Sequence, residues 1–148
     1  MLTDRSVSTA LGYVLTLAIA ALLVGGLFVA GGNFVDDWRE QVIRQEMNVV
    51  GQHVASNVEE ADRMVEAGGS STEVSINQIF PDRVTGSSYR VELVEDDGGY
   101  LRINSTRPEV SVVIEVDNAT ALENSYAEGG EVAVIYDSGD GELVVRDV

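Results

Sequence analysis

The chain has 148 residues, with no cysteine and no lysine, and its 25 acidic residues against 9 arginines give a net charge of −16. This acidity disfavours a nucleic-acid-binding function, because binding to phosphates needs a basic surface. Without cysteine there is no disulfide, thiol nucleophile or zinc–thiolate site. Acidic surfaces stay hydrated in concentrated salt, where screening weakens the repulsion among carboxylates. The composition therefore indicates a halophilic source.

A long apolar stretch follows the first few residues. Ser6 to Val35 carry no charge, and the central part, Leu11 to Ala30, is apolar for about twenty residues. As a helix this central part would be roughly 30 Å long, which is the thickness of the hydrocarbon core of a bilayer. We therefore expect residues 7–35 to form a membrane-spanning helix.

Three interpretations of this stretch compete. A cleavable secretory signal needs a basic start and a shorter apolar core. Here residues 1–5 have no net charge, and cleavage after Ala30 would place the bulky Phe28 at the −3 position. A plain single-pass anchor would keep the helix. A pilin-type signal, which is cut on the cytoplasmic side before the apolar stretch, would keep it too.

The residues before the stretch bear on this choice. Asp4-Arg5-Ser6-Val7-Ser8-Thr9-Ala10-Leu11-Gly12 resembles the start of haloarchaeal type IV pilins, which show Asp-Arg, a small residue, Val-Ser-Pro, two apolar residues and Gly. Thr9 stands where the family usually has Pro, and Ala10-Leu11 replaces Val-Ile. Leu11 occupies the fifth mature position, where bacterial pilins carry Glu. These departures favour a minor or divergent pilin over a major filament subunit.

The resemblance implies a processing site, a fold and a set of partners. Residues 1–6 would be a leader, removed by a prepilin peptidase between Ser6 and Val7. The implied fold is a long N-terminal helix packed on a β domain. The implied partners are membrane lipid, other pilin-like subunits and the pilus assembly machinery.

Small residues recur one helical turn apart within the apolar stretch. Ala21 with Gly25, and Gly26 with Ala30, form small-xxx-small pairs, which let two helices approach closely in lipid. In a filament these pairs would allow close packing of neighbouring helices. The alternative is that Gly and Ala are simply common in membrane helices.

Helical periodicity continues beyond the apolar stretch, over residues 36–67. One apolar stripe has steps of three and four residues: Ile43, Met47, Val50, Val54, Val58, Ala61 and Val65. The polar residues assigned to the opposite, solvent-facing side are Glu40, Arg44, Asn48, Gln52, Glu59, Glu60, Asp62 and Arg63. We predict one helix from Ser8 to Glu66, ended by Gly68-Gly69. The alternative is two helices broken at Gly31-Gly32.

Residues 70–148 change to strand periodicity. The predicted strands are Thr72–Ile79, Ser88–Glu95, Tyr100–Asn104, Glu109–Val116, Glu131–Tyr136 and Glu142–Arg146. Glu109–Val116 is the most apolar and is predicted to be central, whereas Asn118–Gly130 is predicted to be a loop. The expected fold class is α+β, with the amphipathic helix packed on a small antiparallel sheet or sandwich.

The expected location is the cell membrane, with a single span and the C-terminal domain outside. Arg5 lies on one side of the apolar stretch, and Arg39 and Arg44 on the other, so the positive-inside rule gives no orientation. Two sequons begin at Asn104 and Asn118, and each is a candidate N-glycosylation site only if this domain lies outside. A cell-surface filament would have the same topology.

Residues able to carry out chemistry are few. His53 is the single histidine, and no Gly-x-Ser-x-Gly motif accompanies it, which disfavours a hydrolase triad. The acidic segment 137–142 lacks the spacing of an EF-hand. We expect no catalytic residue, no cofactor and no metal, and a structural, pilin-like function. The alternatives are a membrane-anchored binding module outside the cytoplasm and an anchored hydrolase.

Overall fold

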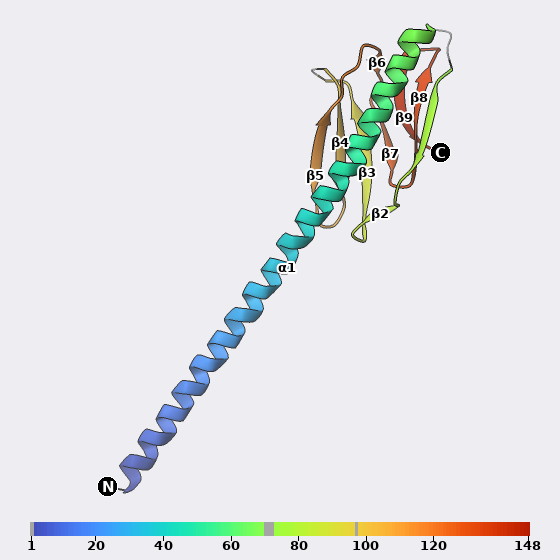
Figure 1. Ribbon diagram of the computed structural model, residues 1–148. Coiled ribbons are helices and arrows are strands. Elements are labelled where there is room, and N and C mark those ends of the chain that lie inside the picture. Colours follow the sequence, from blue (N-terminus) through green and yellow to red (C-terminus); the bar gives the residue numbers. More distant parts are fainter. Residues whose placement is uncertain (1, 70–72, 97) are drawn as a thin grey trace. The chain divides into compact units, whose positions relative to one another are not determined.

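The computed structural model describes residues 2–69, 73–96 and 98–148 of the chain. It has two parts, one ending at Arg39 and one running from Glu40 to Val148, and each is described by itself. Helix α1 (Leu2–Gly68) contributes to both parts (Figure 1). Helical conformation continues through Gly31 and Gly32, so the alternative prediction of two separate helices is wrong.

The C-terminus of α1 is formed by the predicted glycine pair. Gly69 has a φ of 76°, and its N–H donates to the Val65 carbonyl at 2.8 Å. A left-handed residue after the last helical turn is most easily a glycine, because it has no Cβ to clash with the backbone. This geometry confirms the predicted end of the helix.

Two β-sheets follow the helix (Figure 1). The first sheet has the order β1 (Ser75–Ile79), β8 (Glu131–Asp137), β9 (Glu142–Asp147) and β6 (Ala121–Leu122). The second has the order β2 (Arg83–Val84), β3 (Ser87–Val94), β4 (Tyr100–Ser105) and β5 (Ser111–Glu115), with β7 (Ser125–Glu128) also paired to β3. Six of these strands confirm the six predicted ones, although residue 72 of the first prediction lies outside the described residues.

The prediction of a loop over residues 118–130 is wrong, because this segment contains β6 and β7. Strand β6 pairs with β9 in parallel, and β7 pairs with β3 in antiparallel, so this segment joins the two sheets. Leu122 and Ala127 are fully buried. The segment has few apolar residues because each strand is short and buries one side chain, which hid both strands from a reading of periodicity.

The prediction of a central position for β5 is also wrong. Its apolar sequence predicted a central strand, but it lies at the edge of the second sheet and pairs with β4. Val112 and Ile114 point inwards and are half-buried against the core, whereas Val113 is exposed. Val110 and Val116, which flank the strand, are buried and account for much of its apolar character.

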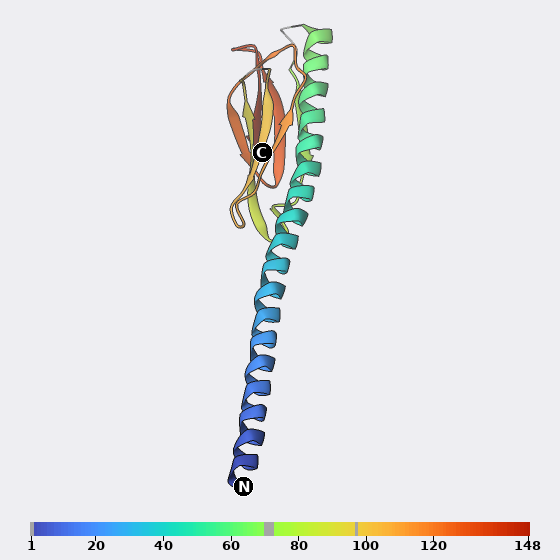
Figure 2. The same ribbon diagram turned by 90° about the vertical axis from the view of Figure 1, so that its left-hand side faces the viewer.

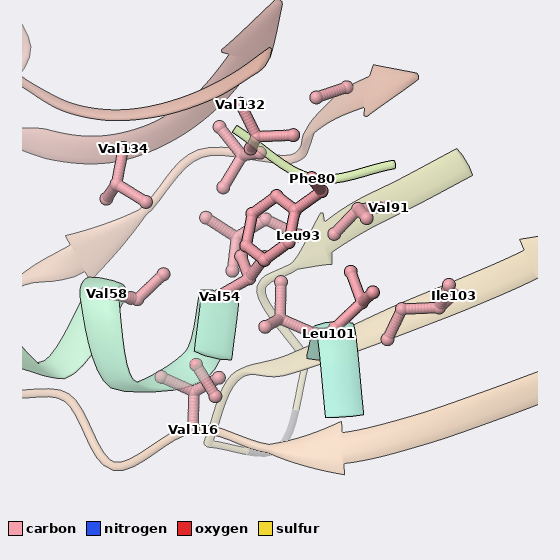
Figure 3. Close-up of a cluster of buried hydrophobic side chains, with 14 of the residues drawn as sticks. Val54, Val58, Phe80, Val91, Leu93, Leu101, Ile103, Val116, Val132 and Val134 are labelled. Atoms are coloured by element: carbon pink, nitrogen blue, oxygen red, sulfur yellow. The ribbon is translucent and has the colours of Figure 1, made fainter. Parts of the chain in front are cut away.

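The core lies between residues 40–68 of α1 and the two sheets. Figure 2 shows this part of the helix along one side of the sheets, and Figure 3 shows Val54 and Val58 facing Leu93, Leu101 and Val132. All seven residues of the predicted stripe are buried, from Ile43 to Val65. Each such aliphatic side chain contributes about 1.5–3 kcal/mol when fully buried. The expected α+β class is confirmed.

Gly51 sets how closely α1 approaches the second sheet. A Cβ at this position would lie 2.6 Å from Ile103 Cδ1 and would also overlap the side chain of Ile114. The missing side chain therefore leaves room for the side chains of Ile103 in β4 and Ile114 in β5 to pack against the helix backbone. Gly51 is not part of the predicted stripe, because glycine has no side chain to contribute to an apolar pattern.

Candidate membrane segment and β domain

The first part of the molecule is the apolar half of α1. Every side chain described from Arg5 to Arg39 is exposed, and large apolar side chains such as Leu22 and Phe28 are 76% and 78% exposed. An 18-residue window has a mean hydropathy of 2.5, so the helix is long and apolar enough to cross a membrane. Exposure of this much apolar surface to water is unfavourable, which is consistent with a membrane anchor or a signal.

Two threonine hydroxyl groups in this half are bonded within the helix. Thr9 Oγ1 donates to the Arg5 carbonyl and Thr16 Oγ1 donates to the Gly12 carbonyl, both at 2.9 Å. A hydroxyl that is bonded within its own helix costs less to place in lipid than an unsatisfied one. These two threonines are therefore compatible with a membrane environment. Ser6 and Val7, the predicted cleavage site, are exposed residues of the same helix.

The four small residues of the apolar stretch lie on the helix surface. Ala21, Gly25, Gly26 and Ala30 are all exposed. A Cβ added at Gly25 or Gly26 would meet no atom within 4 Å. Their small size therefore serves no packing within the described chain, and their role in helix contacts stays a prediction.

The second part of the molecule contains a buried carboxylate, Asp62, on α1. Asp62 was assigned to the solvent-facing side but is 6% exposed. Its Oδ2 accepts the Ala119 N–H at 3.0 Å, and its Oδ1 accepts the Thr120 N–H at 2.7 Å. Asp62 thus holds the connection between β5 and β6 against α1. The signal was available, because Asp62 follows Val58 by four residues and precedes Val65 by three.

The local environment of Asp62 has opposing effects on its ionisation. Burial raises the pKa of the carboxyl group, whereas hydrogen bonds from Thr120 and Ala119 and the charge of Arg63 lower it. The net effect is a pKa below the ordinary value. The folded state therefore favours the ionised carboxylate of Asp62, because the two backbone N–H groups donate hydrogen bonds to it.

The asparagines of the two sequons are both half-buried. Asn104 is a half-buried residue of β4, and its Nδ2 lies 3.5 Å from Glu92 Oε2. Asn118 lies beside the Asp62 contact, where its Nδ2 donates to the Thr120 carbonyl at 2.7 Å and its Oδ1 is buried. Both carboxamides thus take part in local packing. Their glycosylation stays a prediction.

Arginine–tyrosine pairs occupy the outer face of the second sheet. Arg90 Nε donates to Glu128 Oε1 at 2.8 Å, and the guanidinium lies 4.7 Å from the ring centre of Tyr126. On the neighbouring strand, Arg102 donates to the hydroxyl of Tyr100 at 2.7 Å and lies 3.6 Å from Glu92. Cross-strand pairs of this kind stabilise a sheet modestly. Here they also balance acidic charge on this face.

His53 is exposed on α1, and its ring lies 6.4 Å from that of Phe80. It borders a groove of about 570 Å³, together with exposed side chains that include Val49 and Ile79. In the described ranges there is no cluster of three or more acidic, histidine or cysteine side chains positioned for a metal ion. The expectation of a chain without catalytic residues stays an expectation.

The fold and the apolar helix define a class of protein. It is an α+β chain with a pilin-like layout, in which a long apolar N-terminal helix is followed by β-sheets. A family model described as a family of unknown function, DUF7266, matches residues 2–146, and the chain belongs to that family. Comparisons with curated proteins and with solved structures gave no match.

Proposed function

We propose that this protein is a type IV pilin-like structural subunit, held in the membrane by the first half of α1. It displays its acidic β domain outside the cell. Chains of this kind either stay in the membrane or leave lipid to pack through the same helix in a filament. No catalytic step is part of this function.

One observation carries the proposal. A single helix combines an apolar half, whose described side chains are exposed, with an amphipathic half whose stripe is buried under two β-sheets. A cleavable signal is removed from the mature protein, so its helix is not expected to continue into the core helix of the mature domain. Cleavage after Ala30 would leave the core helix with a few exposed turns ahead of the buried stripe. The resemblance at Asp4 to Gly12 supports the same function.

Cell fractionation tests this proposal. The chain should be found in the membrane and in the surface material that shearing releases. Ser6→Leu, which places a bulky residue before the predicted cut, should keep the chain in the membrane and remove it from the sheared fraction. Ser8→Ala is the matched control and should behave like the unchanged chain.

The alternative function, an anchored binding module, predicts another result. Ser6→Leu and the unchanged chain would then both stay in the membrane and both be absent from the sheared fraction. A soluble chain in the medium would contradict both functions. It would indicate an ordinary secreted protein.

A further inference from the structure

Strand β1 has an unpaired edge. The Tyr136 N–H donates to the Val74 carbonyl at 3.0 Å, and the Phe80 N–H donates to the Gly130 carbonyl at 2.9 Å. In an antiparallel pair the residues that bond the partner alternate, so even-numbered residues of β1 bond β8. The backbone groups of Ser75, Asn77 and Ile79 therefore point away from β8. Within the described ranges, no hydrogen bond to another backbone or side chain reaches them.

Strand β5, at the edge of the second sheet, has the same alternation of backbone hydrogen bonds. The Ser105 N–H donates to the Val110 carbonyl at 2.9 Å, and the Val116 N–H donates to the Gly99 carbonyl at 3.2 Å. Even-numbered residues of β5 therefore bond β4, and odd-numbered ones point away. Arg44 Nη1 donates to the outward carbonyl of Ser111 at 3.3 Å. Among the residues described, no protein partner reaches the outward backbone groups of Val113 and Glu115.

The side chains of these two strands also lack the features that usually protect an edge. Natural edge strands carry charges, proline or bulges that prevent pairing with other chains. Strand β1 has the sequence SINQI, with no charge, and β5 has SVVIE, with one. The exposed residues include Ile79 at 79% and Val113 at 58%. Edges with one charge or none are unexpected in a chain with a net charge of −16.

The core is also incompletely covered at these two strands. The partly buried apolar side chains that pack against the core are Ile76 of β1 and Val112 and Ile114 of β5. Both strands have five residues and the same alternation of exposed and half-buried side chains. An added strand at either edge would cover these inward side chains and pair the outward backbone groups.

We infer that the free edge of β1 pairs with the free edge of β5 from a second copy of this chain. Each copy carries a charge of −16, so contact through edges that hold few charges brings the fewest like charges together. A pairing between two different edges leaves one β1 and one β5 free, so further copies add in series. A β1–β1 or β5–β5 pairing would stop at two copies. The inference rests on the proposed function, because only an assembled subunit needs a series of contacts.

Cysteine cross-linking tests this pairing, because the natural chain has no cysteine. Asn77→Cys and Val113→Cys are combined in the full chain, at the centres of β1 and β5. Residues opposite one another across paired strands have Cβ atoms about 5 Å apart. A short bis-maleimide reagent applied to membranes and to the sheared fraction should therefore give a ladder of dimers, trimers and larger products.

Three control samples make the result specific. Each single variant should give at most a trace of dimer, and Asn77→Cys with Asp140→Cys, on an exposed turn, should give no ladder. Strong dimers from a single variant would overturn the inference, because they would show pairing of like edges. Absence of the ladder in a sheared fraction that contains the chain would also overturn it, while leaving the proposed function intact.

A second variant pair tests the backbone contact itself. Asn77→Pro removes an N–H that points away from β8, so the β1–β8 pairing should be kept and the melting temperature should match that of Asn77→Ala. In a Ser75→Cys and Val113→Cys background, Asn77→Pro should reduce the ladder at least tenfold, whereas Asn77→Ala should keep it. Equal ladders from the two variants would contradict pairing through the backbone of β1.

Discussion

Asp62 and Thr120 join the helix to the connection between the two sheets. They are 58 residues apart in sequence, and Asp62 Oδ1 accepts the Thr120 backbone N–H at 2.7 Å. The same carboxylate accepts the N–H of Ala119, so one buried charge satisfies two donors. This contact positions the segment that leads into β6 of the first sheet and then β7 of the second.

Replacing Asp62 should therefore destabilise the β domain. Asp62→Asn keeps the size but presents an amide N–H₂ towards one of the two backbone donors, which should lower the free energy of unfolding by about 1–3 kcal/mol. Urea unfolding of the detergent-solubilised full chain, followed by near-ultraviolet circular dichroism, measures the change. Glu60→Gln, an exposed change on the same helix, is the control and should shift the midpoint little. Equal midpoints for the two variants would show that the contact does not stabilise the fold.

The same carboxylate should make stability depend on pH. The hydrogen bonds and Arg63 outweigh burial and hold the pKa of Asp62 below its ordinary value of 3.8. A group whose pKa is lower in the folded state stabilises the fold above its unfolded pKa, and this contribution is lost as the pH falls through the folded value. The stability difference between the unchanged chain and Asp62→Asn should be constant near neutrality and shrink below about pH 4. A difference that grows on acidification would contradict the assigned direction.

Gly51 should tolerate no large side chain. Gly51→Val would push against Ile103 and Ile114, and overpacking of this kind costs about 1–3 kcal/mol. Gly31→Ala is the matched control on the same helix, because a Cβ there meets nothing within 4 Å. Thermal melting of the β domain should fall for the first variant and stay unchanged for the second. No loss from Gly51→Val would mean that the helix does not approach the sheet closely.

The glycines of the apolar half should matter for assembly and not for the fold. Gly25→Leu with Gly26→Leu adds side chains that meet nothing within the chain, so the circular dichroism and melting of the β domain should not change. If neighbouring helices pack closely through these positions, the sheared surface fraction should fall at least tenfold. Leu23→Ile, on the same stretch, should leave it unchanged. A normal amount of surface material from the glycine variant would show that the small residues are incidental.

The two sequons can be tested by mass. If the β domain is outside and carries glycans, Asn104→Gln and Asn118→Gln should each reduce the mass of the native protein by that of one glycan. Asn124→Gln, which changes an asparagine outside any sequon, is the control. Unchanged masses in both sequon variants would remove glycosylation as support for the outside topology.

Periodic patterns that extend over many residues predicted the helix and most strands. The stripe from Ile43 to Val65 repeats over many turns, and strands such as β3 alternate over eight residues, so each pattern reports burial of one face. Gly68-Gly69 predicted the helix end, because a left-handed residue is needed there. These features depend on local sequence and on one buried face, which is why sequence alone was sufficient.

Features that depend on contacts between distant segments were not predictable in this way. Strands β6 and β7 are too short for a periodic signal, and their pairing depends on partners in β9 and β3. The spacing of Asp62 from Val58 and Val65 indicated burial, but its two partners lie in a distant loop and could not be predicted, and a carboxylate is rarely buried without partners. The edge position of β5 follows from the order of the strands, which hydrophobicity does not report.

The most direct test of the proposed function is the mature N-terminus of the native protein, measured by mass spectrometry of the membrane and sheared surface fractions. Processing as a pilin predicts a chain that begins at Val7 in both fractions, with the apolar half of α1 retained. A chain that begins at Met1 would contradict pilin-type processing and favour an anchored module. A chain that begins near Asn33 would contradict membrane retention altogether, because the apolar half would have been removed as a secretory signal.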